Sequence, residues 1–157
     1  VTIQPDETAG SLHDRLADIG AEVLVKTLTG LVDGSIHPRA QKHAHATYAP
    51  MLTKTSGRID WTKPALEIDA LVRAMNPWPG AYCRYENHRL KIHKAEAIQE
   101  SARETPGTVV AGFPDELRIA TGDGILLIEE LQSASGKRMP IKNFLHGTPI
   151  SPGKRFE

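Results

Sequence analysis

Turn residues recur at short intervals from residue 76 to residue 124, and this spacing constrains the fold more than any other feature of the chain. Asn76-Pro77 is followed by Asn87-His88, by Pro106-Gly107 and by the triplet at 122–124, which contains two glycines. Such residues supply the backbone angles that tight turns need. The intervals between them are short and read as strands. We predict strands at 81–86, 90–98, 108–111, 117–121 and 125–131.

Five short strands favour a closed or nearly closed sheet, because closure removes exposed strand edges. A five-stranded, partly open Greek-key barrel has this size and is a common scaffold for binding oligonucleotides. Before the strands, apolar residues at three-and-four spacing predict a helix at about 64–75, with Thr62 as a candidate N-cap. A last short helix is predicted at about 141–146. The predicted fold class is α+β, mainly β, with an open Greek-key (OB-like) barrel and its leading helix at 63–157.

Residues 8–33 carry two further helical patterns, and each ends at a glycine. Thr8 is a candidate N-cap, and Gly20 and Gly34 lie where a left-handed residue is expected after a helix. We therefore predict a helical hairpin within residues 1–36. Two such helices alone would leave their apolar stripes exposed, so we expect them to belong to a larger body. Residues 37–62 are rich in turn residues and lack a sustained period, and they are predicted to form an extended linker.

The charges give only local support for a nucleic-acid partner. Nineteen basic and nineteen acidic residues cancel, so the net charge does not predict one. From residue 137 onward, however, five cations face the single anion Glu157. In addition, Arg89, Lys91 and His93 alternate with apolar residues, so one face of the predicted strand is basic. A solvated strand face is the alternative for each residue. Our candidate phosphate-binding residues are Arg84, Lys91, Lys94, Lys137, Arg138, Lys142, Lys154 and Arg155.

The sequence offers no secretory signal and no apolar run long enough to span a bilayer. Cys83 has no partner for a disulfide and is expected to be a small buried apolar residue. We therefore expect a cytoplasmic protein with no membrane association.

Patterns that would indicate catalysis or metal binding are weak. The segment at 121–124 resembles a nucleotide-binding loop but lies between two strands, which favours a hairpin turn. His43 and His45 lack the companion ligands that a metal site needs, so no metal site is predicted. Trp78 lies between two prolines, and we expect it to pack the leading helix against the barrel rather than to stack on a base, since a base platform must be exposed to solvent. Trp61 is interpreted in the same way.

Four segments, taken together, resemble one protein family. They are GSLHDRLADIGAEVL at 10–24, TSGRIDW at 55–61, VRAMNPWPGA at 72–81 and LQSASGKRMPIKNFLHGTPISPGKRF at 131–156. In this order they are similar to methionyl-tRNA formyltransferases. The resemblance implies transfer of a formyl group from 10-formyltetrahydrofolate to the amino group of methionyl initiator tRNA.

The resemblance also implies that residues 1–36 are a remnant of the catalytic domain. In the family, the catalytic Asn, His and Asp and the folate pocket lie in an amino-terminal domain, and no position of this chain matches them. No catalytic residue and no cofactor is therefore assigned to this chain, and 10-formyltetrahydrofolate is expected only as co-substrate of an intact enzyme. The expected partners are initiator methionyl-tRNA and the catalytic domain of the same protein.

Two other functions remain open at this stage. The barrel could be a structural module that braces the catalytic domain, with its charges merely solvated. The chain could also be the equivalent part of a sugar-nucleotide formyltransferase, which shares the VRA and PWPGA motifs. The segments at 136–139 and 144–147 resemble the tRNA enzyme and favour it over the sugar enzyme.

Overall fold

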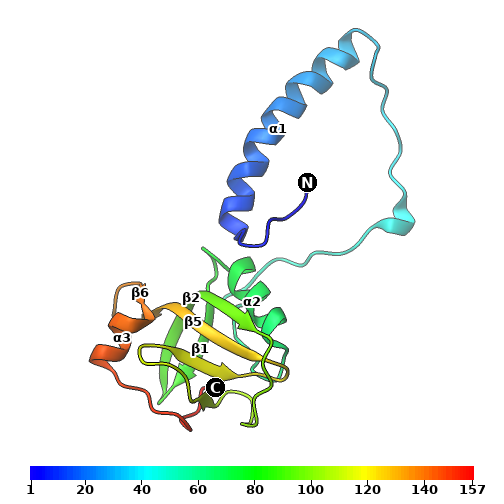
Figure 1. The fold of residues 1–157 in the computed structure, drawn as a ribbon. Coiled ribbons are helices and arrows are strands. Elements are labelled where there is room, and N and C mark those ends of the chain that lie inside the picture. Colours follow the sequence, from blue (N-terminus) through cyan, green and yellow to red (C-terminus); the bar gives the residue numbers. More distant parts are fainter. The chain divides into compact units, whose positions relative to one another are not determined.

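The computed structural model describes residues 1–157 (Figure 1). The chain divides into two compact units, Val1–Leu52 and Thr53–Glu157. No helix in either unit has both the length and the apolar character that crossing a membrane requires.

The first unit contains one long helix, α1 (Ala9–Val32), and a short 3-10 turn, η1 (His43–His45). Thr8 caps α1 as predicted: its hydroxyl accepts from the Ser11 N–H at 3.2 Å, and the Ser11 hydroxyl accepts from the Thr8 N–H at 3.0 Å. The helix ends just before Gly34, which has a φ of +78° as expected for a residue after a helix.

The predicted helical hairpin is wrong, because α1 runs through Gly20 without a break. A glycine inside a helix costs only about 1 kcal/mol relative to alanine. The residues on both sides of Gly20 are good helix formers, and an ion pair joins Glu22 to Lys26 one turn apart. Without a turn to change the direction of the chain, the two predicted helices form one.

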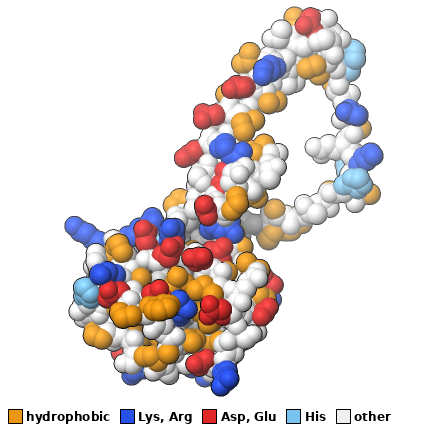
Figure 2. Space-filling model, in the orientation of Figure 1, with side chains coloured by type: hydrophobic (Ala, Val, Ile, Leu, Met, Phe, Trp, Pro, Cys, Tyr) orange, Lys and Arg blue, Asp and Glu red, His pale blue; other side chains and the backbone are white.

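Helix α1 exposes most of its apolar side chains (Figure 2). Only Gly30 is buried along its length. Large hydrophobic side chains that remain exposed include Leu16, Val23, Leu24, Leu28 and Leu31. An amphipathic helix normally buries such a stripe against a larger body. The first unit therefore has no hydrophobic core of its own.

The second unit is a curled antiparallel sheet, a half-barrel, with a helix before it and a short helix after β6 (Figure 1). The strand order is β1-β2-β5-β4-β3, with β6 paired to β5. Strands β3, β4 and β5 are consecutive neighbours, whereas β2 reaches β3 by a long connection and pairs with β5, which is the Greek-key arrangement. The elements are α2 (Ala65–Ala74), β1 (Ala81–Tyr85), β2 (His88–Ile98), β3 (Val109–Val110), β4 (Leu117–Ala120), β5 (Ile125–Ser133), β6 (Met139–Pro140) and α3 (Ile141–Gly147).

The predicted α+β, mainly β fold class is confirmed, and all five predicted strands are present within a few residues of their expected bounds. Glu86 and Asn87 both have positive φ, as a two-residue hairpin turn requires, and Gly124 has a φ of +84°. Strand β6 was not predicted. Thr62 does not cap α2: its hydroxyl donates to Asp60 Oδ1 at 2.7 Å, and Pro64 occupies the N-cap position.

The core lies between α2 and the concave face of the sheet. Ile68 and Val72 of α2 are buried with the inward side chains of β4 and β5 and with Phe156 near the carboxy terminus. Ile59 and Trp61 also belong to this core, although they come from the segment predicted as linker. The second unit accordingly includes residues 53–62 as well as 63–157.

The segment before α2 is held close to two turns of the sheet. A Cβ atom at Gly57 would lie 2.1 Å from the Gly80 carbonyl oxygen, and one at Gly122 would lie 1.8 Å from the Thr62 carbonyl oxygen. Ile59 donates its N–H to the Tyr82 carbonyl at 2.9 Å. Glycine is needed at both positions because backbone approaches backbone there.

The two tryptophans differ in their environment. Trp61 is 5% exposed and lies in the core as expected. Trp78 is 56% exposed, so the prediction that it packs α2 against the sheet is wrong. The prolines on both sides of it fix the backbone of the turn, but the ring faces solvent.

Candidate nucleic-acid interface

The outer face of β1 and β2 carries two rows of polar and charged side chains. In β1 the side chains of Ala81, Cys83 and Tyr85 are buried, so those of Tyr82 and Arg84 lie on the opposite, outer face. The pairing of β1 with β2 follows from the two-residue turn between them. One row across the strands is Arg58, Tyr82, Lys91 and Gln132, and the other is Arg84 and Arg89.

Four cations of these rows form the cation cluster, defined here as Arg58, Arg84, Arg89 and Lys91. Arg84 and Arg89 are directly opposite each other on paired strands, and like charges in such positions destabilise a sheet. The guanidinium of Arg89 lies 3.6 Å above the centre of the Tyr82 ring, a cation–π contact that holds it flat against the strand. No residue of the cluster forms an ion pair. An anion bound on this face would therefore relieve repulsion without breaking an existing pair.

Two consecutive hydrogen bonds, both made by the Gln132 side chain, connect this face to the loop before β6. His93 Nε2 and the Gln132 side-chain Oε1 lie 3.1 Å apart, and the Gln132 side-chain Nε2 donates to the Gly136 main-chain carbonyl at 3.0 Å. Gln132 is the strand partner of Lys91. The loop that carries Lys137 is therefore tied to the outer face beside Lys91.

The eight predicted phosphate-binding residues fall into two groups. Arg84, Lys91, Lys137 and Arg155 form no ion pair. The other four are paired with carboxylates: Lys94 with Glu129 at 3.0 Å, Arg138 with Glu130, Lys142 with Asp115 at 2.9 Å and Lys154 with Glu86 at 3.5 Å.

The paired group contributes less positive potential than its residue count suggests. Lys142 is typical: its ammonium donates to Asp115 and holds the pKa of that carboxyl below its ordinary value, with a smaller contribution from His146. Exposed pairs of this kind are weak because water and salt screen them, so a phosphate could replace the carboxylate. Each such pair nevertheless has no net charge.

Two members of the cation cluster, Arg58 and Arg89, were not among the predicted site residues. Arg58 lies in the segment that was predicted as linker. Arg89 was recognised as part of a basic strand face, but its position opposite Arg84 depends on the register. The turn predicted at Asn87-His88 would have placed Glu86 opposite Arg89. The observed turn is one residue earlier, at Glu86-Asn87, and it pairs Tyr85 with His88 and therefore Arg84 with Arg89.

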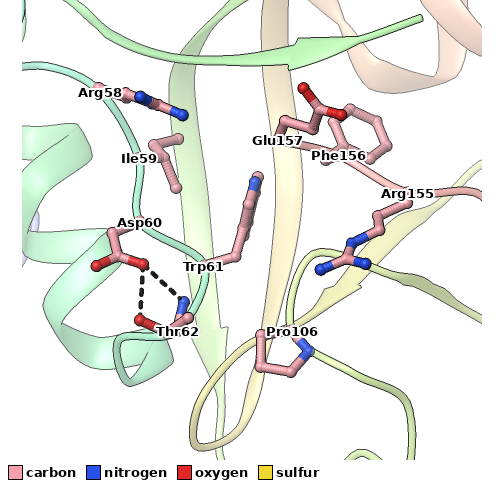
Figure 3. A pocket seen from close by; sticks show the side chains of 9 residues that line it. All are labelled: Arg58, Ile59, Asp60, Trp61, Thr62, Pro106, Arg155, Phe156 and Glu157. Carbon is pink, nitrogen blue, oxygen red and sulfur yellow. Dashed lines mark hydrogen bonds between the residues drawn. The ribbon is translucent and has the colours of Figure 1, made fainter.

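A pocket of about 710 Å³ lies beside the carboxy-terminal segment (Figure 3). Arg58 and Arg155 contribute guanidinium groups to it, and Asp60 and Glu157 contribute carboxylates, so its charged groups balance. The Asp60 carboxylate accepts from the Thr62 hydroxyl, which lowers the pKa of Asp60. The Trp61 Nε1 group is buried without a hydrogen-bond partner. No cysteine, serine, lysine or histidine lines this pocket.

Neither nucleophilic nor metal-dependent chemistry is indicated elsewhere. Cys83 is buried as expected, and burial raises the pKa of its thiol to about 12, so it is not a reactive thiolate near neutral pH. His43 and His45 lie on η1, and the structure contains no group of three or more side chains suited to hold a metal ion.

Solved structures with the same fold are known. Crystal structures of HypX from Aquifex aeolicus are similar to this chain: one variant gives a TM-score of 0.62 at 20% identity, covering 90% of this chain and 26% of that one. A second HypX structure, in complex with tetrahydrofolic acid, gives a TM-score of 0.57 at 19% identity, covering 87% and 26%. At this level of identity the similarity concerns the fold alone.

Comparison of sequences is more specific. A methionyl-tRNA formyltransferase of Desulfotalea psychrophila is 45% identical over 93% of this chain, and one of Caldanaerobacter subterraneus is 43% identical over 98%. The chain spans about half the length of these relatives, 45% and 49%. The family described as "Formyl transferase, C-terminal domain" matches residues 51–149, nearly all of the second unit. The chain therefore belongs to the formyl transferase family, and its second unit is that family's carboxy-terminal domain.

Proposed function

We propose that this chain is the carboxy-terminal part of a methionyl-tRNA formyltransferase and that its second unit binds the backbone of the initiator tRNA. The intact enzyme transfers a formyl group from 10-formyltetrahydrofolate to the amino group of the methionyl residue on that tRNA. The proposal makes the chain a component of translation initiation in the cytoplasm. It assigns the chemistry and the folate to the half of the enzyme that this chain lacks.

The observation that carries the proposal is the cation cluster. Its four positive charges lie on one outer face of β1, β2 and the adjoining segment, and none forms an ion pair with a carboxylate. A cation that reaches a phosphate releases condensed counterions and gains affinity that does not depend on base sequence. The tethered loop places Lys137 next to this face and extends the same surface.

Contacts with the RNA backbone fit this face better than reading of paired bases. The side chains of a sheet face project as separate points, whereas double-stranded RNA hides its base edges in a deep, narrow major groove. Arginine and lysine on adjacent strands match the spaced phosphates of a backbone. The expected role of this unit is therefore to hold the tRNA, and not to identify it by sequence.

Helix α1 supports the other part of the proposal, a partner half in the same protein. Its exposed apolar stripe has no cover within the first unit. The relatives are about twice as long as this chain, which leaves room for a domain to supply that cover. We infer that α1 packs on the catalytic domain in the intact enzyme.

Filter binding of the 157-residue chain to initiator tRNA across a salt series tests the tRNA proposal. The test variant replaces Arg58, Arg84, Arg89 and Lys91 with glutamine. A matched control replaces four other exposed cations that form no ion pair, Arg39, Lys42, Lys54 and Arg103, so both variants lose four charges. We expect the test variant to bind more weakly. The slope of log affinity against log salt concentration should become less steep by about 0.7–0.9 for each phosphate contact removed. Equal behaviour of the two variants would show that the cluster is not the binding face.

The balanced ion pairs favour a second function, bracing of the catalytic domain. Four of the eight predicted cations are neutralised by carboxylates, and the net charge of the chain is zero. The same glutamine variant, introduced into the intact enzyme, separates the two functions. A raised KM for tRNA at unchanged thermal stability supports tRNA binding, and an unchanged KM supports bracing.

A further inference from the structure

Trp78 is a large aromatic side chain that the fold holds open to solvent. It lies in the turn between α2 and β1, with Pro77 before it and Pro79 after it, and it is 56% exposed. The Gly80 N–H donates to the Met75 carbonyl at 2.8 Å and closes the turn. Because proline fixes φ at residues 77 and 79, the backbone of the turn around Trp78 has little conformational freedom.

The turn is fastened to the strand that carries the cation cluster. The Asn76 side-chain amide donates to the His93 carbonyl of β2 at 3.3 Å. The Lys91 side chain passes over Gly80, with its Cδ atom 3.7 Å from the place that a Cβ atom of residue 80 would occupy. Ala81, the first residue after the turn, pairs with Ile92. The Lys91 side chain thus crosses the turn at Gly80, which is two residues after Trp78 in the sequence.

We propose that Trp78 is a stacking platform for an unpaired RNA base and that Lys91 neutralises the phosphate next to that base. This inference rests on the proposed RNA-binding function and names the part of the RNA that the face takes. A positively charged groove that also offers an aromatic ring is the usual means of holding single-stranded nucleic acid, because every base has a flat face to stack. Tryptophan has only two side-chain torsions, so it loses little conformational freedom when a base stacks on it.

An apolar contact with another protein would also explain why Trp78 is exposed. The experiment below separates base stacking from such a protein contact. The chain has only two tryptophans, and Trp61 is buried in the core. Tryptophan fluorescence therefore reports on Trp78 whenever an added molecule stacks on an exposed ring. Stacking requires a free base, whereas phosphate contacts are available in a duplex as well.

The experiment titrates the 157-residue chain at low salt with a single-stranded oligoadenylate and, separately, with an RNA duplex carrying the same number of phosphates. We expect strong quenching by the single strand, weak quenching by the duplex, and no strong quenching of the Trp78→Phe variant by either. By anisotropy of a labelled oligoadenylate, Trp78→Ala should weaken binding by roughly fivefold to 100-fold. Trp78→Phe, which keeps a ring, should retain most of the affinity.

Phe113→Ala is the matched control, since Phe113 is another exposed aromatic residue, 68% exposed, on the loop before β4. It should bind as the unmodified chain does. Salt-dependent binding without quenching, or with Trp78→Ala as tight as the unmodified chain, would overturn the stacking role and leave the backbone-binding function standing. Absence of any salt-dependent RNA binding would overturn both.

Discussion

Arg84 and Glu157 exchange a pair of backbone hydrogen bonds although they are far apart in the sequence. The Arg84 N–H donates to the Glu157 carbonyl at 2.7 Å, and the Glu157 N–H donates to the Arg84 carbonyl at 2.9 Å. On its other side the same segment bonds near β3, where Val109 donates to Lys154 and Phe156 donates to Gly107, both at 2.8 Å. The carboxy-terminal segment thus joins β1 and β3, the two strands at the ends of the sheet order.

Phe156 is expected to be the most important side chain of this closing segment. It is 1% exposed, stacks on Tyr85 at 4.9 Å between ring centroids and meets Trp61 edge to face at 6.2 Å. Phe156→Ala removes this contact and leaves a cavity between the edge strands. We expect a loss of about 3–5 kcal/mol in the free energy of unfolding of the second unit. Urea unfolding followed by tryptophan fluorescence measures it.

Arg155→Ala is the control for that substitution, because Arg155 is the exposed neighbour of Phe156 and keeps the same backbone bonds. It should change the unfolding free energy by no more than about 0.5 kcal/mol. An equally small loss in both variants would mean that the segment stabilises the unit through its backbone hydrogen bonds and not through the Phe156 ring.

Gly57→Ala is expected to destabilise the second unit although it adds a single methyl group. The new Cβ atom would meet the Gly80 carbonyl oxygen at 2.1 Å, and neither backbone segment can move without breaking the hydrogen bonds beside it. We expect a loss of about 1–3 kcal/mol, as for other overpacked sites. Thermal unfolding monitored by tryptophan fluorescence is the measurement.

Gly20→Ala is the control for Gly57→Ala, because at residue 20 an added methyl group has free space. Nothing lies within 4 Å of a Cβ atom at Gly20, which is inside α1. This substitution should leave the unfolding of the second unit unchanged and should increase the helical signal of the chain in circular dichroism, since alanine favours a helix by about 1 kcal/mol over glycine. A decrease in helicity would argue for a turn at residue 20.

Cys83 is expected to make the second unit less stable at high pH. Burial raises the pKa of its thiol from 9.0 to about 12. Between these values the unfolded chain loses the proton and the folded chain keeps it, so the stability present below pH 9 is lost as the pH rises toward 12. The urea midpoint should fall more between pH 8 and pH 10.5 for the unmodified chain than for Cys83→Ala. At pH 8 the folded thiol should react with a disulfide reagent only as fast as the unit unfolds.

Local patterns predicted the strands well and the helical region less well. The turns at 122–124 and, within one residue of the predicted Asn87-His88, at Glu86-Asn87 lie where two strands must reverse, and short-range backbone preferences decide such positions. At Gly20 the same kind of signal was misleading, because a glycine ends a helix only when the following residues favour another direction. One unfavourable residue did not outweigh the helix formers around it.

Long-range pairings were beyond the sequence patterns. Strand β6 exists because Met139 and Pro140 lie beside β5, and residues 154–157 bond to two strands distant in the sequence. Ile59 and Trp61 become core residues only because the segment before α2 runs along the sheet. The ion pairs of Lys94, Arg138, Lys142 and Lys154 likewise depend on which strands and loops meet. The alternation along β2, in contrast, was enough to identify its basic face.

The difference between an unpaired and a paired cation gives the last prediction. Arg84→Gln and Lys142→Gln each remove one charge, but Arg84 belongs to the cation cluster and Lys142 already donates to Asp115 at 2.9 Å. If the cluster is the binding face, Arg84→Gln should weaken tRNA binding and reduce the salt slope by about 0.7–0.9, whereas Lys142→Gln should leave both nearly unchanged. Filter binding at four or more salt concentrations measures both quantities. Equal losses in the two variants would mean that the whole charge of the surface, and not the β1 and β2 face, attracts the RNA.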